Sequence, residues 1–272
     1  MRAAFGLIVL LAFGVVVGAS VVRAAPRSPY LEELTWTELR DAVAAGATTV
    51  IIPVGGTEQS GPHLALGKHN VRVKVLAGRI ATALGDTLVA PVLAYVPEGS
   101  ISPPSEHMRF PGTISVPVAA FKGTLEGAAR SLRQAGFTHI VLIGDHGGYQ
   151  TQLKEVADQL NKAWAGSPAR AHYIAAYYRA SEAPYDKLLR AQGLSDAEIG
   201  MHAGAADTSL QLAIDPATVR TDRLDSAHGA ATGVLGDPRR ASAALGQPAV
   251  DLIVNDTVAA IRKARLEKRQ RP

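Results

Sequence analysis

Histidines and carboxylates gather in three short clusters of this 272-residue chain, and such side chains together can bind a metal ion or move protons. The first cluster is 58–63 (EQSGPH) with 68–70 (KHN), the second is 145–148 (DHGG), and the third is 202–209 (HAGAADTS). A metal ion held by such groups activates water and polarises a carbonyl group. The clusters therefore indicate hydrolytic chemistry.

The absence of cysteine from the whole sequence narrows that chemistry. Thiolate ligands and cysteine nucleophiles are excluded, so a metal site must use His, Asp, Glu and water. These ligands suit Zn, Mn or similar divalent ions. In an oxidising compartment the fold must be stable without disulfides.

Each cluster alone has a structural explanation, because a histidine among glycines after a strand can serve as a cap or turn residue. The joint placement of the clusters argues for a site instead. Six side chains are predicted to fall at one side of a sheet, which packing does not require. These are Glu58, His63, His69, His146, His202 and Asp207. Asp145 is interpreted as a cap for the helix expected near Tyr149.

Hydrophobic periodicity and Gly/Pro punctuation predict alternating strands and helices that position these clusters. Strands are expected over 49–54, 87–96, 139–143 and 171–177, and helices over 71–84, 118–135, 149–164 and 250–267. This pattern is typical of an α/β fold with a mostly parallel sheet covered on both faces, whose strand carboxyl ends form the site. The segment 97–112, rich in Pro, Gly and Ser, is predicted to be an active-site loop or oligomer contact.

The N-terminus has the features of an export signal. A positive start at Met1-Arg2 precedes an apolar run over 5–22, and Ala24 ends a small-residue cleavage pattern. We therefore expect a signal peptide over 1–24 and a single domain over 25–272, exported to the periplasm or secreted. The alternative is an uncleaved membrane anchor, since about 18 apolar residues is the lower limit for spanning a bilayer.

The formal charge of +4 does not indicate a nucleic-acid partner. Much of the excess lies at 262–271, at the end of the predicted last helix, while lysines and arginines elsewhere alternate with acids. A solvated helix end explains this pattern better than a binding patch. We expect a small-molecule substrate, with no nucleic acid and no membrane contact after signal cleavage.

Five segments in order resemble the creatininase family. PVGGTEQSGPHLALGKHN is similar to its Glu-Gln-His-Gly-x-His-Leu-Pro signature, and IGDHGG to its Asn-Gly-His-Gly-Gly. The other three are SEHMRFPGTIS, HAGAADTS and GVLGDP. The resemblance implies a three-layer sheet-and-helix sandwich, a homo-oligomer (a hexamer in several members), and a one- or two-metal site. Members open cyclic or linear amides, and some cleave a peptide.

The resemblance also assigns roles to individual residues. Glu58 and His146 match metal ligands, His202 matches a histidine thought to assist proton transfer, and Asp207 stands where many members have a glutamate ligand. Ser60 and His69 depart from the pattern, since they replace a metal-binding histidine and an aspartate that often bridges two metals.

These two exchanges make the site less negative, which disfavours two divalent cations close together. We therefore expect one metal per chain, Zn or Mn, with two as the alternative. The expected ligands are Glu58, His69 and His146, with Asp207 as a fourth ligand or water-orienting group. His63 is the reserve ligand. The family loop places Glu106 and His107 at the substrate entrance or in a neighbouring subunit.

The predicted mechanism is hydrolysis of a C–N bond in an amide or cyclic amide by metal-activated water. Asp207 or Glu58 would take the water proton, and His202 would protonate the departing nitrogen. Backbone N–H groups of Gly147 and Gly148 would stabilise the oxyanion. The alternatives are a lactone or ester hydrolase of the same fold, and a non-catalytic periplasmic ligand-binding protein. Creatinine is not the expected substrate, because its breakdown is largely intracellular and this chain carries an export segment.

Overall fold

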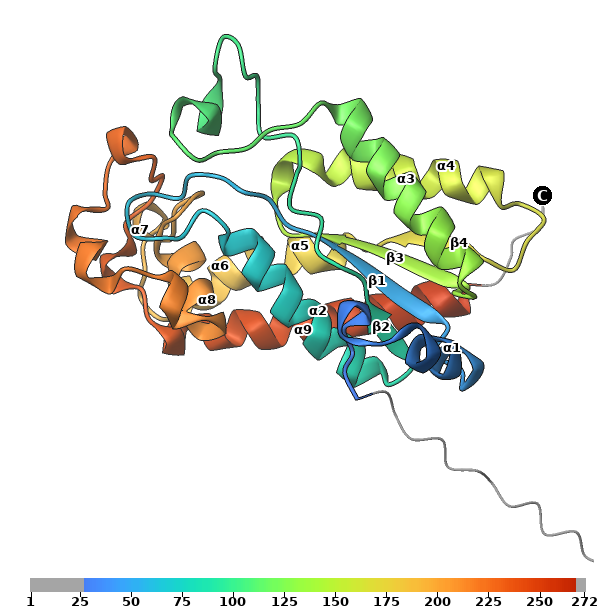
Figure 1. Cartoon of the computed structure of the whole chain (residues 1–272). Coiled ribbons are helices and arrows are strands. Elements are labelled where there is room, and N and C mark those ends of the chain that lie inside the picture. The colour runs from blue at the N-terminus through green and yellow to red at the C-terminus, as the bar shows by residue number, and fades with distance from the viewer. Residues whose placement is uncertain (1–26, 268–272) are drawn as a thin grey trace, which may run out of the picture.

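The central sheet has four parallel strands in the order β2-β1-β3-β4. A computed structural model describes residues 27–267 of the chain (Figure 1). The strands are β1 (Thr49–Val54), β2 (Thr87–Val89), β3 (His139–Gly144) and β4 (Arg170–Tyr173). β1 and β3 are apolar along almost their whole length, as expected for strands covered on both faces.

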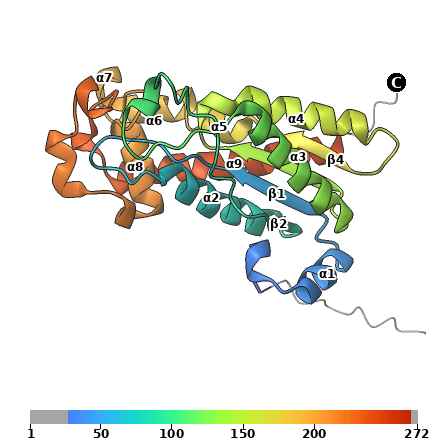
Figure 2. The same cartoon turned by 45° about the horizontal axis from the view of Figure 1, so that its top comes forward.

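Helices cover both faces of this sheet (Figures 1 and 2). Val50 and Ile52 of β1 belong to the core shared with α3 (Val118–Gln134) and α4 (Gln150–Ala163). Ile51 points the opposite way, as the two-residue period of a strand requires, into the core shared with the helices of the other face. Those helices include α2 (Lys68–Leu84), α5 (Ala176–Ala180) and α9 (Ala243–Leu266). The predicted three-layer α/β architecture is confirmed.

Several predicted boundaries were wrong. α2 begins at Lys68 rather than at residue 71, which brings Lys68 and His69 into its first turn. β2 ends at Val89, and the rest of the expected 87–96 strand continues only as isolated bridges. The expected 171–177 strand ends at Tyr173, before α5. α9 begins at Ala243, where the Ser242 side chain accepts a hydrogen bond from Leu245 N–H.

The remaining elements were not predicted. The other helices are α1 (Trp36–Ala44), α6 (Ala183–Ala191), α7 (Asp196–Ile199) and α8 (Ala205–Ile214). Short 3-10 turns lie at Leu31–Glu33, Glu106–Arg109, Gly147–Tyr149, Pro216–Thr218, Thr221–Ser226, Ala230–Thr232 and Pro238–Arg240. The 3-10 turn at Glu106–Arg109 lies in the predicted loop 97–112, and α8 carries the end of the third polar cluster.

The predicted export segment over 1–24 lies outside the described residues and stays a prediction. Within residues 27–267, no helix combines the length and the apolar character needed to cross a membrane.

Two histidines at the end of the sheet opposite the polar clusters are expected to make the stability of the fold depend on pH. His139 Nδ1 lies 3.0 Å from His172 Nε2, so one ring must be neutral to accept the bond. Burial lowers the pKa of His172 to about 4, and burial also lowers the pKa of His139. In the unfolded chain histidine titrates near ~6.5, so the unfolded state binds more protons between these values.

We therefore expect stability from His172 to be complete above pH ~6.5 and to be lost as the pH falls towards 4, by about 1–3 kcal/mol. Urea unfolding of wild type and His172→Gln across this range measures the effect, and the slope against pH should be shallower in the variant. His228→Gln, at an exposed position, is the control. Equal slopes in His172→Gln and wild type would contradict the assignment.

Candidate metal centre and active site

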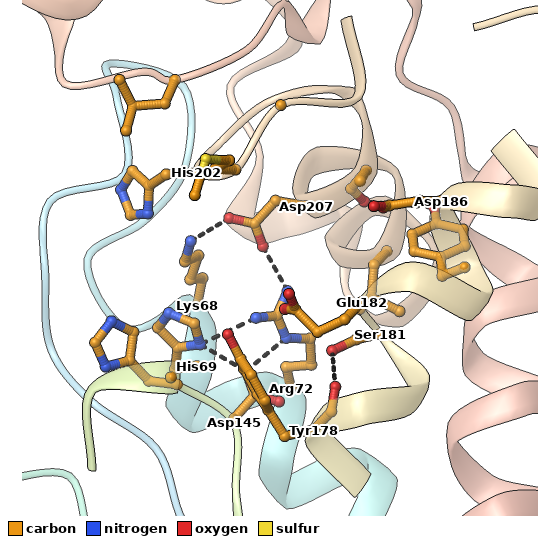
Figure 3. Close-up of a pocket in the computed structure, with 18 of the residues that line it drawn as sticks. Lys68, His69, Arg72, Asp145, Tyr178, Ser181, Glu182, Asp186, His202 and Asp207 are labelled. Carbon is orange, nitrogen blue, oxygen red and sulfur yellow. Dashed lines mark hydrogen bonds and ion pairs between the residues drawn. The ribbon is translucent and has the colours of Figure 1, made fainter. Parts of the chain in front are cut away.

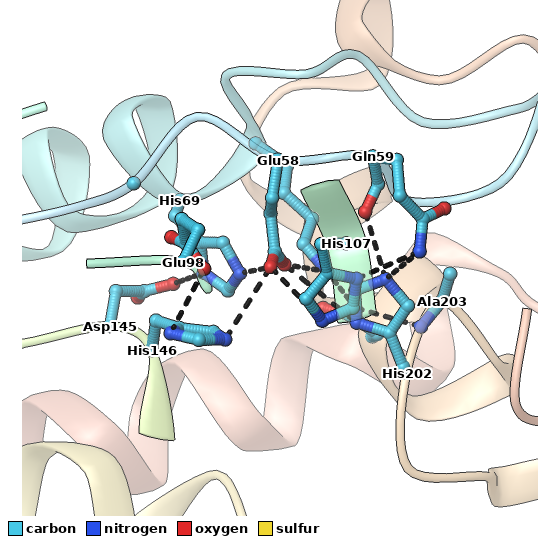
Figure 4. Close-up of polar contacts among 12 residues, drawn as sticks. Glu58, Gln59, His69, Glu98, His107, Asp145, His146, His202 and Ala203 are labelled. Carbon is cyan, nitrogen blue, oxygen red and sulfur yellow. Dashed lines mark hydrogen bonds and ion pairs between the residues drawn. The ribbon is translucent and has the colours of Figure 1, made fainter. Parts of the chain in front are cut away.

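The polar clusters meet at the carboxyl ends of the strands, as predicted (Figures 3 and 4). Glu58 follows β1, Glu98 lies in the segment after β2, and His146 follows β3. His69 lies in the first turn of α2, and His202 precedes α8. His69, His146 and His202, together with His107, line a cavity of about 350 Å³.

Glu58 is the centre of this site, with a side chain that has no exposure to solvent. Its Oε1 lies 2.8 Å from His69 Nε2, and both Lys68 Nζ and His202 Nδ1 are 3.7 Å away. Burial would raise the pKa of Glu58, but the His69 hydrogen bond and the positive charge of Lys68 hold it well below its usual value. Glu58 is therefore an anion in the interior.

The second oxygen of Glu58 is the best candidate for binding a metal ion. Oε2 has no hydrogen-bond partner, although His107 Nε2 and His146 Nε2 each lie 3.4 Å away. Ligand atoms of these three residues all fall within 4.8 Å of one another. A buried, unpaired carboxylate oxygen beside two imidazole nitrogens fits a divalent ion such as Zn or Mn.

His69 is oriented by a second carboxylate. Its Nδ1 lies 2.6 Å from Asp145 Oδ1, which also accepts a 2.7 Å hydrogen bond from Arg72 Nε. Tyr177 donates to the other Asp145 oxygen at 2.7 Å. The prediction that Asp145 caps a helix was wrong, because both of its oxygens face His69, Arg72 and Tyr177, and the His146 side chain accepts from the Gly148 N–H instead.

Glu98 is a buried carboxyl group that sequence reasoning missed. Neither of its oxygens is paired with an N–H donor, Oε2 lies 3.6 Å from His146 Nδ1 (Figure 4), and the group is within hydrogen-bonding reach of Glu58. Burial, followed by the nearby Glu58 charge, raises the pKa of Glu98 to about 9. An added Cβ at Gly56 would lie 2.6 Å from Glu98 Oε1, so the glycine leaves the space that this carboxyl group fills.

Asp207 is held by two cations. Lys68 Nζ forms a close ion pair with its Oδ2, and Arg72 Nη1 donates to Oδ1 at 2.6 Å. Burial would raise the pKa of Asp207, but the charges of Lys68 and Arg72 keep it well below its usual value. Its predicted roles as fourth ligand and proton acceptor stay predictions, and these contacts favour a structural role.

His202 and Gln59 complete the wall of the site. His202 Nε2 lies 2.9 Å from the Gln59 carbonyl oxygen, which places a proton on Nε2 and leaves Nδ1 facing Glu58. Burial lowers the pKa of His202 to about 3, so the ring is neutral near pH 7. The Gln59 amide nitrogen lies 2.9 Å from His107 Nδ1, an arrangement that directs His107 Nε2 towards Glu58.

Three other predicted site residues, His63, Ser60 and Glu106, make no hydrogen bond or ion pair with Glu58 in the described part of the chain. His63 Nε2 lies 2.8 Å from Thr208 Oγ1 on α8, and burial lowers the pKa of His63 to about 4. Ser60 Oγ is buried without a partner. Glu106 is exposed to solvent, whereas its neighbour His107 lies beside Glu58.

Gly147 and Gly148 follow His146 as predicted. A side chain at Gly147 would meet the Tyr178 hydroxyl at 2.7 Å, and Gly147 lines the cavity. The Gly148 N–H already donates to His146 Nδ1 at 3.2 Å. The proposed oxyanion role of these two N–H groups stays a prediction, with Gly147 the better placed.

With the geometry in place, comparison with known proteins identifies the family. Residues 32–261 match the family profile described as "Creatininase: Creatinine amidohydrolase". The chain belongs to the creatininase family. It is thus a metal-dependent hydrolase of the amidohydrolase type, in agreement with the sequence prediction.

Relatives within this family act on different molecules. The chain is 28% identical to creatinine amidohydrolase of Pseudomonas putida, over 87% of this chain and 97% of the relative. It is 30% identical to the mycofactocin precursor peptide peptidase of Mycolicibacterium smegmatis, over 79% of this chain and 84% of the relative. A solved structure, "Creatininase Mn", covers 88% of this chain and 100% of its own with 27% identity and a TM-score of 0.73.

Proposed function

We propose that this creatininase-family chain hydrolyses a C–N bond in an amide or cyclic amide at a centre that holds one Zn or Mn ion. The single observation that carries the proposal is the orphaned Glu58 Oε2 between the Nε2 atoms of His107 and His146. Bound there, the ion would lower the pKa of water and polarise the substrate carbonyl.

The chain's own groups supply the proton transfers. His202 Nδ1 carries no proton and faces the site, so it can accept a proton from the attacking water and deliver it to the departing nitrogen. Gln59 fixes this tautomer through its carbonyl oxygen. Asp207 is a poor candidate for this step because both of its oxygens already accept hydrogen bonds, from Lys68 and Arg72.

The ligand set is tested by metal analysis of wild type, His107→Ala, His146→Ala and His69→Ala. About one metal per chain is expected in wild type, with loss in the first two variants and retention in His69→Ala. Loss in His69→Ala with retention in His107→Ala would instead support His69, the ligand predicted from the sequence. His228→Ala serves as a control because His228 is exposed.

The bond that is cleaved is tested with a panel of linear amides, cyclic amides, short peptides and lactones. Turnover of C–N substrates that disappears on metal removal supports the proposal. Turnover confined to lactones would contradict it and assign the same site to ester hydrolysis.

Glu98 gives a further prediction for the same centre. Groups behind the ligands of a metal site hold them in position, and the buried Glu98 carboxyl group packs beside His146, with Oε2 3.6 Å from Nδ1. Glu98→Ala should therefore weaken metal binding about 10–100-fold, as measured by chelator competition. Glu106→Ala, which removes an exposed acid in the same segment, should bind normally. Equal affinity of Glu98→Ala and wild type would exclude this role.

Export and oligomeric assembly remain proposals. The apolar run over 5–22 supports an extracytoplasmic location, and the family resemblance supports a homo-oligomer.

A further inference from the structure

A buried lysine lies inside the candidate metal centre. Lys68 is the first residue of α2, and its side chain is only 1% exposed. Figure 3 shows its Nζ pointing towards Asp207. It forms a close ion pair with Asp207 Oδ2 and lies 3.7 Å from Glu58 Oε1. A lysine is almost never fully buried unless its charge is paired, so this ammonium is held in place by the site.

The lysine makes the two oxygens of Glu58 unequal. Oε1 faces Lys68 Nζ and accepts a hydrogen bond from His69 Nε2, whereas Oε2 has no hydrogen-bond partner. An ion can therefore reach Oε2 without displacing an N–H donor. An ion at Oε1 would have to displace His69 and lie beside an ammonium group.

The charges around the site also favour a single ion. Among the described residues of this network, three carboxylates pair with two cations. The carboxylates are Glu58, Asp145 and Asp207, and the cations are Lys68 and Arg72. One divalent ion more than compensates the negative charge that is left. A second divalent ion would leave a larger buried excess of positive charge, which is costly in the interior.

We propose that the ammonium group of Lys68 takes the place of a second metal ion. Its positive charge restricts the centre to one divalent ion, bound at Glu58 Oε2. This inference rests on the proposed metal-dependent function. It makes Lys68 a positioning residue, which fixes Glu58 Oε1 and Asp207 and keeps a further ion away from them.

The test is titration of metal-free protein with Mn²⁺, followed by calorimetry and electron paramagnetic resonance. Wild type should bind one Mn²⁺ and give the spectrum of an isolated ion. Lys68→Met, which removes the charge and keeps the length of the side chain, should bind a second Mn²⁺ at least about 100-fold more tightly than wild type does, because like charges about 4 Å apart repel strongly in a protein. Coupling between two neighbouring ions should then appear in the spectrum.

Two matched variants support the assignment. Lys68→Arg keeps the cation and should bind one ion. Lys74→Met removes an exposed lysine of the same helix, which pairs with Glu32, and should also bind one ion.

The outcomes separate the two proposals. No metal in wild type would overturn both the function and this inference. One ion in both wild type and Lys68→Met would overturn the role of Lys68 alone. Two ions in wild type would overturn the role of Lys68 and the single-ion centre, but not the hydrolytic function. If Lys68→Met does not fold, the number of Mn²⁺ ions bound by wild type and by Lys68→Arg still tests the inference, because two ions in either protein would contradict it.

Discussion

Glu58→Gln is expected to lose its metal ion and its turnover while it keeps its fold. The amide cannot supply the anionic Oε2 that lies between His107 and His146. Because even outer contacts of a metal site change affinity about 10–100-fold, removal of this central ligand should weaken binding by at least about 100-fold. Elemental analysis, together with turnover at saturating metal, measures both effects.

The control for this variant is Glu155→Gln, in which an exposed surface ion pair with Lys122 is lost. That change should affect neither metal content nor turnover, since exposed ion pairs contribute little. A Glu58→Gln protein that retains stoichiometric metal would show that the ion binds elsewhere, and it would remove the basis of the proposed centre.

Gly246→Ala is expected to destabilise the fold by about 3 kcal/mol or more, because added volume has no space at this position. A Cβ at Gly246 of α9 would lie 1.9 Å from the Ser209 carbonyl oxygen and 2.8 Å from the Leu210 nitrogen of α8. Both are backbone atoms that no rotamer change can move, so the two helices must separate. Urea unfolding of wild type and variant measures the change.

Gly123→Ala is a suitable comparison, because a Cβ at this helical glycine of α3 meets no atom within 4 Å. Alanine should stabilise there by about 0.5–1 kcal/mol, since it loses less conformational freedom than glycine on folding. The two substitutions should therefore have opposite signs. Destabilisation of similar size in both would mean that helix propensity, and not the α8–α9 contact, dominates.

Local sequence patterns were sufficient for the sheet and for the general position of the site. The apolar runs of β1 and β3 and the glycines after them predict buried strands followed by a polar edge. Glu58 and His146 follow directly from this, because each lies a few residues beyond a strand end. Their meeting at one edge is a property of any parallel sheet.

The contacts that decide the role of each residue could not be predicted in the same way. Asp145 was assigned from its local position before a helix, yet its partner Arg72 is 73 residues away in sequence. Lys68 meets Asp207 across 139 residues. Hydrophobic periodicity carries no information on such pairs.

The segment after β2 was equally hard to resolve from sequence. Its irregular path is fixed by long-range contacts, such as the Gln59 N–H that donates to Thr113 Oγ1. Glu98 stands alone between Pro97 and Gly99, and only its position after a strand end could have marked it. His107 was predicted to lie at the substrate entrance or to come from a neighbouring subunit, whereas its Nε2 lies 3.4 Å from Glu58 Oε2 of the same chain.

The three candidate ligands come from three separate segments, which affects the rigidity of a chain that has no cysteine to form disulfides. Glu58 follows β1, His107 belongs to the segment between β2 and α3, and His146 follows β3. An ion shared by the three would act as a removable cross-link between separate loops, a role that disulfides take in many exported proteins. Chelation would then release this end of the molecule while the layers beneath it stay packed, so the supply of metal would control the rigidity of the active site as well as its chemistry.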